Sequence, residues 1–189
     1  RRQAMSPLIQ RNQIVDNQTY EDDRDDIRRR NHEEKRVRRI HLGDNLTILY
    51  ENRDTLTYHV QEILRAERIA REAAIQHEID VYNAMLGDPG DLACALLIEI
   101  AEAEQRAPLL KEWLGLESTL YVRLEDGTRV AATYDPTQVG DDRLSAVQYL
   151  RFPVQGRVPV AIGTTFGALD GEVELTDEQR AALAADLAR

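Results

Sequence analysis

An alternating pattern over residues 119–134 restricts the fold of this chain more than any other feature of its sequence. Apolar residues occupy every second position on both sides of an Asp126-Gly127 pair. Such a pair is typical of a two-residue hairpin turn, because Asp and Gly tolerate the positive φ that the turn requires. The pattern therefore predicts antiparallel β-structure, and the remaining elements must pack against it.

Other segments predict further strands. Residues 37–50 repeat the hairpin pattern around a Gly-Asp-Asn turn, and the segments 92–100 and 145–154 are short apolar runs between turn signals. Residues 156–174 are rich in Gly and Val and predict a loop with one short strand. We expect these segments to form a mixed or antiparallel sheet of about five to six strands.

Helical periodicity marks the rest of the chain. Apolar residues recur at helical spacing over residues 58–85 until Gly and Pro stop the pattern, which predicts one long helix. Two shorter helices are predicted over residues 104–114 and after Thr176. Residues 20–35 predict an N-terminal charged helix, because acidic residues precede basic ones as the helix dipole favours. The fold class is α+β, with the long helix covering one face of the sheet.

The length of the chain, 189 residues, is that of one domain. Residues 1–18 show no steady periodicity and predict a loose N-terminal arm, whereas residues 19–189 predict a single α+β domain. Both alternations of the strand at 145–154 mix apolar and polar side chains, which predicts a strand covered on both faces. Its Arg151 then needs an internal partner, and we expect Glu99 to be that partner.

Charge and composition exclude several classes of protein. The formal net charge of −10 opposes binding to nucleic acid, so we expect no such partner. The longest apolar run covers only residues 92–98, far short of the roughly 20 residues that span a bilayer, and predicts no membrane segment. Cys94 is the only cysteine and has apolar neighbours, so it predicts a buried thiol and no disulfide. We expect a cytoplasmic protein.

Motifs for common chemistries are missing from the sequence. It has no Gly-x-x-x-x-Gly-Lys phosphate loop, no Gly-x-Gly-x-x-Gly turn and no serine in a nucleophile elbow. None of the four histidines is preceded by Glu at the spacing used in di-iron helical bundles. The sequence alone leaves open whether the chain is an enzyme.

Some polar residues near the apolar patterns could nevertheless act chemically. The candidate catalytic residues are Glu62, Arg65, Glu67 and Gln148. The candidate metal ligands are His59, Glu62, His77 and Glu99. His59 and Glu62 share one helix face, and imidazole with carboxylate suits non-haem iron, so iron or haem is the cofactor that this alternative would require. We also expect a homodimer, because the predicted long helix carries more apolar positions than a small sheet can cover.

An arginine cluster offers a different kind of site. The candidate partner-binding residues are Arg28, Arg29, Arg30 and Arg36. Guanidinium groups pair well with carboxylates, and an arginine-rich segment on an acidic body suits electrostatically steered association with an acidic partner.

Several strings resemble an uncharacterised bacterial family that carries a domain of unknown function. The resemblance covers residues 25–152 and the terminal helix, and the strings that carry it lie at 45–55, 60–69, 78–83, 96–99 and 145–152. It departs near Thr164, where the family would have His-Pro followed by an aromatic residue. Genes of this family are often found beside those for rubrerythrin and a cysteine-rich iron–sulfur oxidoreductase, which implies a role in peroxide or oxygen defence.

The resemblance implies a context and no reaction. The residues that match its strings and could act chemically are Gln61, Glu62, Arg65, Glu67, Glu99, Gln148 and Arg151. Two functions follow as hypotheses. The first is an accessory or interaction protein of a bacterial redox or oxidative-stress system, with rubrerythrin or the iron–sulfur oxidoreductase as partner. The alternative is a metal- or haem-dependent oxidoreductase with a His/carboxylate site between the long helix and the sheet.

Overall fold

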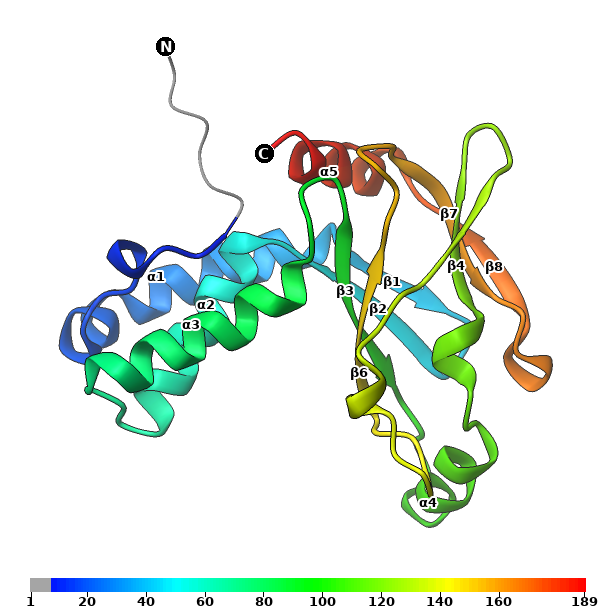
Figure 1. Ribbon diagram of the computed structural model, residues 1–189, viewed down its shortest axis with the longest axis horizontal. Coiled ribbons are helices and arrows are strands. Elements are labelled where there is room, and N and C mark those ends of the chain that lie inside the picture. Colours follow the sequence, from blue (N-terminus) through cyan, green and yellow to red (C-terminus); the bar gives the residue numbers. More distant parts are fainter. Residues whose placement is uncertain (1–7) are drawn as a thin grey trace.

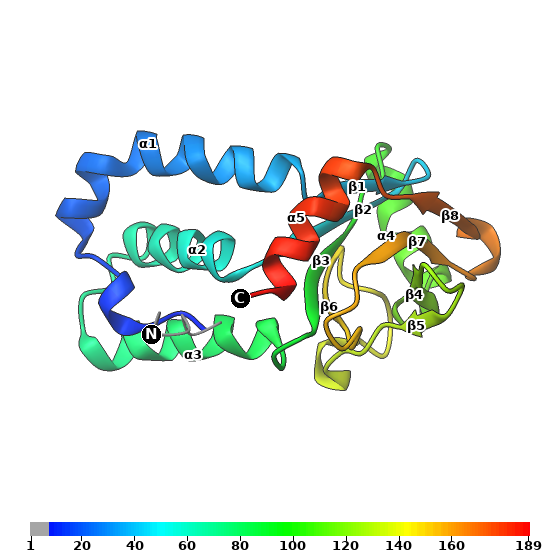
Figure 2. The same cartoon turned by 90° about the horizontal axis from the view of Figure 1, so that it is seen from above.

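The computed structural model describes residues 8–189 and confirms the α+β class (Figure 1). Its strands form two antiparallel sheets of four strands each, where the sequence predicted one sheet. Three helices lie together on one side of the first sheet, and the second sheet lies on its other side (Figure 2). The molecule is therefore layered as helices, sheet and sheet, so that the first sheet is covered on both faces.

The two sheets are built from segments that alternate along the chain. The first has the order β1 (Arg39–Leu42), β2 (Leu46–Glu51), β3 (Leu92–Ile98) and β6 (Val147–Phe152). The second has the order β5 (Arg129–Ala131), β4 (Leu120–Leu124), β7 (Pro159–Thr164) and β8 (Gly171–Glu174). Both predicted hairpins are present, as the pairs β1–β2 and β4–β5. An isolated bridge between Thr133 and Arg151 links the edges of the two sheets.

The prediction of a loop with one short strand over residues 156–174 is wrong, because this segment contains both β7 and β8. Every residue of β7 is buried. The positions of β7 on the outer face of the sheet are Ala161 and Gly163, and the longer side chains of the flanking strands β4 and β8 cover them. Because these outer positions hold small residues, the strand does not alternate apolar and polar side chains. The periodicity that identified the other hairpins was therefore absent here.

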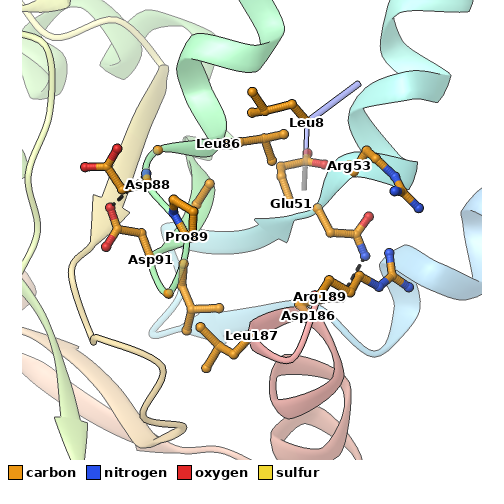
Figure 3. Close-up of a pocket in the computed structure, with 15 residues that line it drawn as sticks. Leu8, Glu51, Arg53, Leu86, Asp88, Pro89, Asp91, Asp186, Leu187 and Arg189 are labelled. Carbon is orange, nitrogen blue, oxygen red and sulfur yellow. Dashed lines mark hydrogen bonds between the residues drawn. The ribbon is translucent and has the colours of Figure 1, made fainter. Parts of the chain in front are cut away.

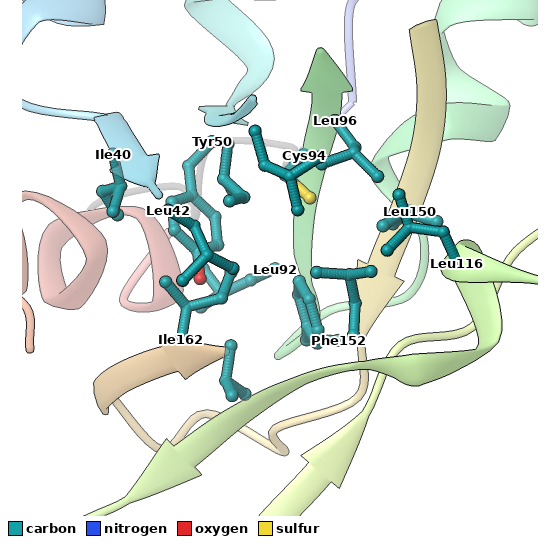
Figure 4. Packing of buried hydrophobic residues seen from close by; sticks show 14 of the residues in the cluster. Ile40, Leu42, Tyr50, Leu92, Cys94, Leu96, Leu116, Leu150, Phe152 and Ile162 are labelled. Atoms are coloured by element: carbon teal, nitrogen blue, oxygen red, sulfur yellow. The ribbon is translucent and has the colours of Figure 1, made fainter. Parts of the chain in front are cut away.

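The main hydrophobic core lies between the two sheets (Figure 4). Leu42 and Tyr50 from the first sheet lie near Ile162 from β7, and Cys94, Leu150 and Phe152 continue the same core. Burial raises the pKa of the Cys94 thiol well above its usual value, as expected for an unreactive core cysteine.

The outer face of edge strand β6 is only partly covered, by α3, which corrects the prediction of a strand covered on both faces. Gln148, Leu150 and Phe152 point into the core, whereas Val147 and Tyr149 are 41% and 37% exposed.

The predicted long helix is two helices. Residues 53–86 form α2 (Arg53–Ala66) and α3 (Glu72–Leu86), separated by a turn in which Arg68 has a φ of 55°. Helix α2 packs against α3 and, on its other side, against α1 (Asn17–Arg36), the charged helix that the sequence predicted. Leu64 and Ile75, on either side of the turn, belong to one apolar cluster. These two residues are separated by about three helical turns, so the apolar pattern keeps the period of a single helix across the turn and gives no sign that the helix ends there.

The expectation of a loose arm over residues 1–18 fails for its described part. Ile9 and Ile14 are buried in the cluster formed by α2 and α3. The Val15 amide donates to Gln61 Oε1 at 2.8 Å, and the Ile9 amide donates to Asn83 Oδ1 at 2.8 Å. The segment from residue 8 onward is therefore part of the fold, and residues 1–7 lie outside the described range.

The remaining helices are α4 (Ala103–Glu112) and α5 (Asp177–Leu187), which confirms both shorter predicted helices. Thr176 caps α5 through the amide of Gln179, as its sequence suggested. In the part of the chain from residue 8 onward, no helix is both long and apolar enough to cross a membrane.

Candidate functional site

An open groove of about 710 Å³ runs along α1 and is lined mainly by basic side chains. We call it the basic groove and define it by Arg28, Arg29, His32, Lys35, Arg36, Arg39, His41 and Tyr58, with Asp25 and Asn31 in its wall. Residues spaced by three or four along a helix share one face, so α1 aligns the first five of these side chains. Strand β1 and helix α2 complete the groove with Arg39, His41 and Tyr58.

The cations of the basic groove differ in whether the protein neutralises them. Arg29 forms an ion pair with Asp26 at 3.0 Å, and Arg36 forms one with Glu178 at 2.8 Å. The side chains of Arg28 and Arg39 form no ion pair with any residue in the range 8–189. Two guanidinium groups are therefore left to face the groove.

The Lys35 amine contacts an imidazole in the same region. Its Nζ lies 3.0 Å from His59 Nε2, and the same nitrogen of His59 lies 3.6 Å from Glu51 Oε1. Lys35 forms no ion pair with a carboxylate in the described chain. Burial lowers the pKa of Lys35 below its usual value, and the nearby Glu51 charge opposes this shift without cancelling it.

Local structure holds Glu51 and His59 in place. Glu51 ends β2 on the side that faces the helices, and its side chain is only 4% exposed. Asn52 and Thr55 form a reciprocal capping box at the start of α2, and the Thr55 hydroxyl also donates to Glu51 Oε2. The His59 ring stacks on Tyr82 of α3, with ring centroids 6.0 Å apart and an interplanar angle of 5°. Burial raises the pKa of Tyr82 to about 12, so its hydroxyl is neutral at physiological pH.

A second hollow, of about 60 Å³, lies between the start of α2, the loop after α3 and the end of α5 (Figure 3). Asp186 accepts hydrogen bonds from Arg38 Nε at 2.8 Å, Arg38 Nη2 at 2.9 Å and Asn52 Nδ2 at 2.9 Å. Arg189 of the same chain end donates to Asp54 Oδ2 at 2.7 Å. These contacts join α5 to α1 and α2, and we interpret them as structural.

The structure does not bring the four candidate metal ligands together. His59 contacts Lys35, whereas Glu62 accepts hydrogen bonds from Tyr20 at 2.6 Å and Arg24 at 2.9 Å. His77 is exposed on α3, and Glu99 is exposed after β3. Within residues 8–189, no group of three or more His, Cys, Asp or Glu side chains could hold a metal ion.

The four candidate catalytic residues do not form one site. Arg65 pairs with Glu21 and also lies close to Glu62, so Glu62 and Arg65 belong to one ion-pair network between α1 and α2. Glu67 is exposed at the end of α2. Gln148 is buried in the core, where its Nε2 donates to the Ser145 carbonyl at 2.9 Å. The structure therefore groups Glu62 with Arg65 and places Gln148 elsewhere.

The expected pair between Glu99 and Arg151 is wrong. In the β3–β6 register Arg151 lies opposite Ala93. Glu99 lies beyond the far end of β3, roughly 20 Å away at about 3.3 Å per residue. The sequence located both strands but did not show which of their residues lie opposite each other, and that register places the two side chains at different ends of β3.

The structure gathers most of the predicted partner-binding residues. Arg28, Arg29 and Arg36 line the basic groove, but Arg30 lies on another side of α1 and faces a hollow between α1 and α2. Lys35 and Arg39 were missed, although helical spacing from Arg28 would have indicated Lys35. Glu51 was missed as well, and the capping pattern that follows it was the available signal.

Comparisons with known proteins agree with this fold. A crystal structure of a novel protein of unknown function from Burkholderia pseudomallei is similar, with a TM-score of 0.86 and 27% sequence identity over 94% of this chain and 98% of that chain. No curated protein matches the chain. A family model described as a protein of unknown function, DUF3501, matches residues 8–187. Because the match spans nearly the whole sequence, the chain belongs to the DUF3501 family.

Proposed function

We propose that this protein is a non-catalytic accessory protein that docks an acidic surface of a redox partner in its basic groove. The observation that carries the proposal is the pair of unneutralised guanidinium groups, Arg28 and Arg39, in a groove with further basic residues. Charged groups that a protein leaves unpaired at a concave surface favour a ligand of opposite charge.

The overall charge makes the groove selective. The chain carries a formal net charge of −10, so an acidic partner is repelled by most of its surface and attracted by the basic groove. This contrast orients the partner during encounter. The attraction weakens with salt, because the Debye length is only about 8 Å at physiological ionic strength.

The family resemblance supplies the class of partner. Rubrerythrin and the cysteine-rich iron–sulfur oxidoreductase are the partners implied by the genes that accompany such families. An accessory role also agrees with the separate positions of the candidate catalytic and metal-binding residues. The alternative, an iron- or haem-dependent oxidoreductase, has no supporting contact among its four candidate ligands.

The test is co-purification followed by a measured affinity. Tagged protein is recovered from its native host at low salt, and mass spectrometry identifies the bound proteins. We expect rubrerythrin or the iron–sulfur oxidoreductase, and we expect the double substitution Arg28→Glu, Arg39→Glu to weaken binding by about tenfold or more, equivalent to about 1.4 kcal/mol.

Arg30→Glu is the matched control for the single substitution Arg28→Glu, because each replaces one exposed arginine of α1 by glutamate and only Arg28 lies in the basic groove. The partner affinity of Arg30→Glu should fall far less than that of Arg28→Glu. Equal losses for the two variants, or recovery of neither redox protein at low salt, would remove the proposal.

A further inference from the structure

The chain contains two lysines, Lys35 and Lys111, and their surroundings differ sharply. Lys111 is exposed on α4, whereas Lys35 is half-buried and its amine contacts His59. A lysine that served only to neutralise the buried Glu51 would form an ion pair with it. Here the His59 imidazole contacts both groups, and no Lys35–carboxylate pair forms in the described residues.

We propose that the basic groove binds a small anionic aldehyde or ketone, and that Lys35 forms an imine with its carbonyl carbon. This inference goes beyond the proposed function, because it needs the groove but no partner protein. It assigns Lys35 as the nucleophile and His59 as the proton-transfer group beside it.

The reaction balances without a further reactant. The unprotonated Lys35 amine adds to the carbonyl carbon, and one proton passes from its nitrogen to the alkoxide oxygen to give a neutral carbinolamine. A second proton on that oxygen lets it leave as water while the C=N bond forms, and the iminium nitrogen then releases a proton to give the neutral imine. The net change is one amine and one carbonyl converted to one imine and one water, and no group is oxidised or reduced.

The geometry supplies the group that moves the proton. His59 Nε2 lies 3.0 Å from Lys35 Nζ, within hydrogen-bonding distance, so it can accept the proton released after addition. Glu51 Oε1 lies 3.6 Å from the same nitrogen, so a buried carboxylate stands beside the proton-transfer group. Burial already lowers the pKa of Lys35, which raises the fraction of free amine at neutral pH.

The groove also specifies the charge of the ligand. Arg28 and Arg39 have no ion-pair partner in the described chain, and a guanidinium binds a carboxylate or phosphate with paired hydrogen bonds. These features favour an oxyanion-bearing carbonyl compound over a neutral one.

The experiment traps the imine by reduction. Purified protein is incubated at neutral pH with glyoxylate and sodium cyanoborohydride, and peptide mass spectrometry quantifies modification at each lysine. We expect Lys35 to be modified about tenfold faster than Lys111, because a proton acceptor lies 3.0 Å from Lys35 Nζ and the arginines of the groove hold the anion nearby. Equal modification, or faster modification of Lys111, would overturn the proposal.

A neutral aldehyde and two groove variants test the ligand class. Propanal should show a smaller preference for Lys35, and Arg28→Gln with Arg39→Gln should reduce the glyoxylate preference to the propanal level. Arg30→Gln is the control and should leave both preferences unchanged. A glyoxylate preference that survives the double substitution would show that the groove does not select the anion.

Variants at the amine and at its neighbour test the reaction itself, in an assay that contains no partner protein. Lys35→Arg should lose the adduct at that position, because a guanidinium does not form the imine. His59→Gln should slow the modification of Lys35 while leaving that of Lys111 unchanged, with folding confirmed by circular dichroism. An unchanged Lys35 rate in a folded His59→Gln variant would refute the role of His59.

Discussion

The buried pair between Arg38 and Asp186 offers the sharpest test of how α5 is held. Both side chains are nearly inaccessible, at 5% and 7% exposed, and they form two hydrogen bonds of 2.8 and 2.9 Å. Removing one member leaves the other charge buried without its main partner. The pair joins positions 148 residues apart in the sequence, so its loss should affect the whole fold.

The magnitude follows from what remains after each substitution. Breaking a buried ion pair costs about 3–5 kcal/mol. Asp186→Asn should fall near the lower value, because Arg38 keeps Glu34, whose carboxylate and carbonyl it contacts at 2.8 and 2.7 Å. Arg38→Met should fall near the upper value, because Asp186 would retain only the Asn52 amide. Against a total stability of about 5–15 kcal/mol, either loss is large.

Urea unfolding followed by circular dichroism measures these costs, with matching transitions by fluorescence to verify two-state behaviour. The double variant Arg38→Met, Asp186→Leu should be less destabilised than the sum of Arg38→Met and Asp186→Leu by about 2 kcal/mol or more, because it leaves no unpaired charge. Additivity within about 0.5 kcal/mol would show that the two residues do not interact and would refute the reasoning.

Two further predictions concern the helical layer and the assembly. The hydrogen bond from Arg24 lowers the pKa of Glu62 below 4.5, so the stabilisation by this carboxylate is present above pH 4.5 and is lost as the pH falls through the pKa of the folded state. Glu62→Gln should therefore reduce the loss of unfolding free energy at acid pH, measured by urea unfolding at a series of pH values. An unchanged loss at acid pH would contradict this. We still expect a homodimer, now through the exposed Val81, Val147 and Tyr149 of α3 and β6, and a monomer mass by light scattering would contradict it.

The sequence by itself determined the local elements whose signals lie within a few residues. The hairpin at Asp126-Gly127, the charge order of α1 and the Thr176 cap each depend on neighbouring residues, and each is present in the structure. Three of the four arginines predicted to bind a partner also line the basic groove, because their helical spacing places them on one face of α1 whatever the helix packs against.

Tertiary structure alone decided how these elements meet. The turn at Arg68 preserved the phase of the apolar pattern. Strand β7 lacks alternation because its outer positions, Ala161 and Gly163, are small residues that side chains of β4 and β8 cover. The candidate site, too, depends on contacts between elements that the sequence does not show. Lys35, Glu51 and His59 come from a helix, a strand and a second helix, and periodicity within one element carries no information about distances between elements. Only packing of the helical layer on the first sheet brought their polar atoms within reach.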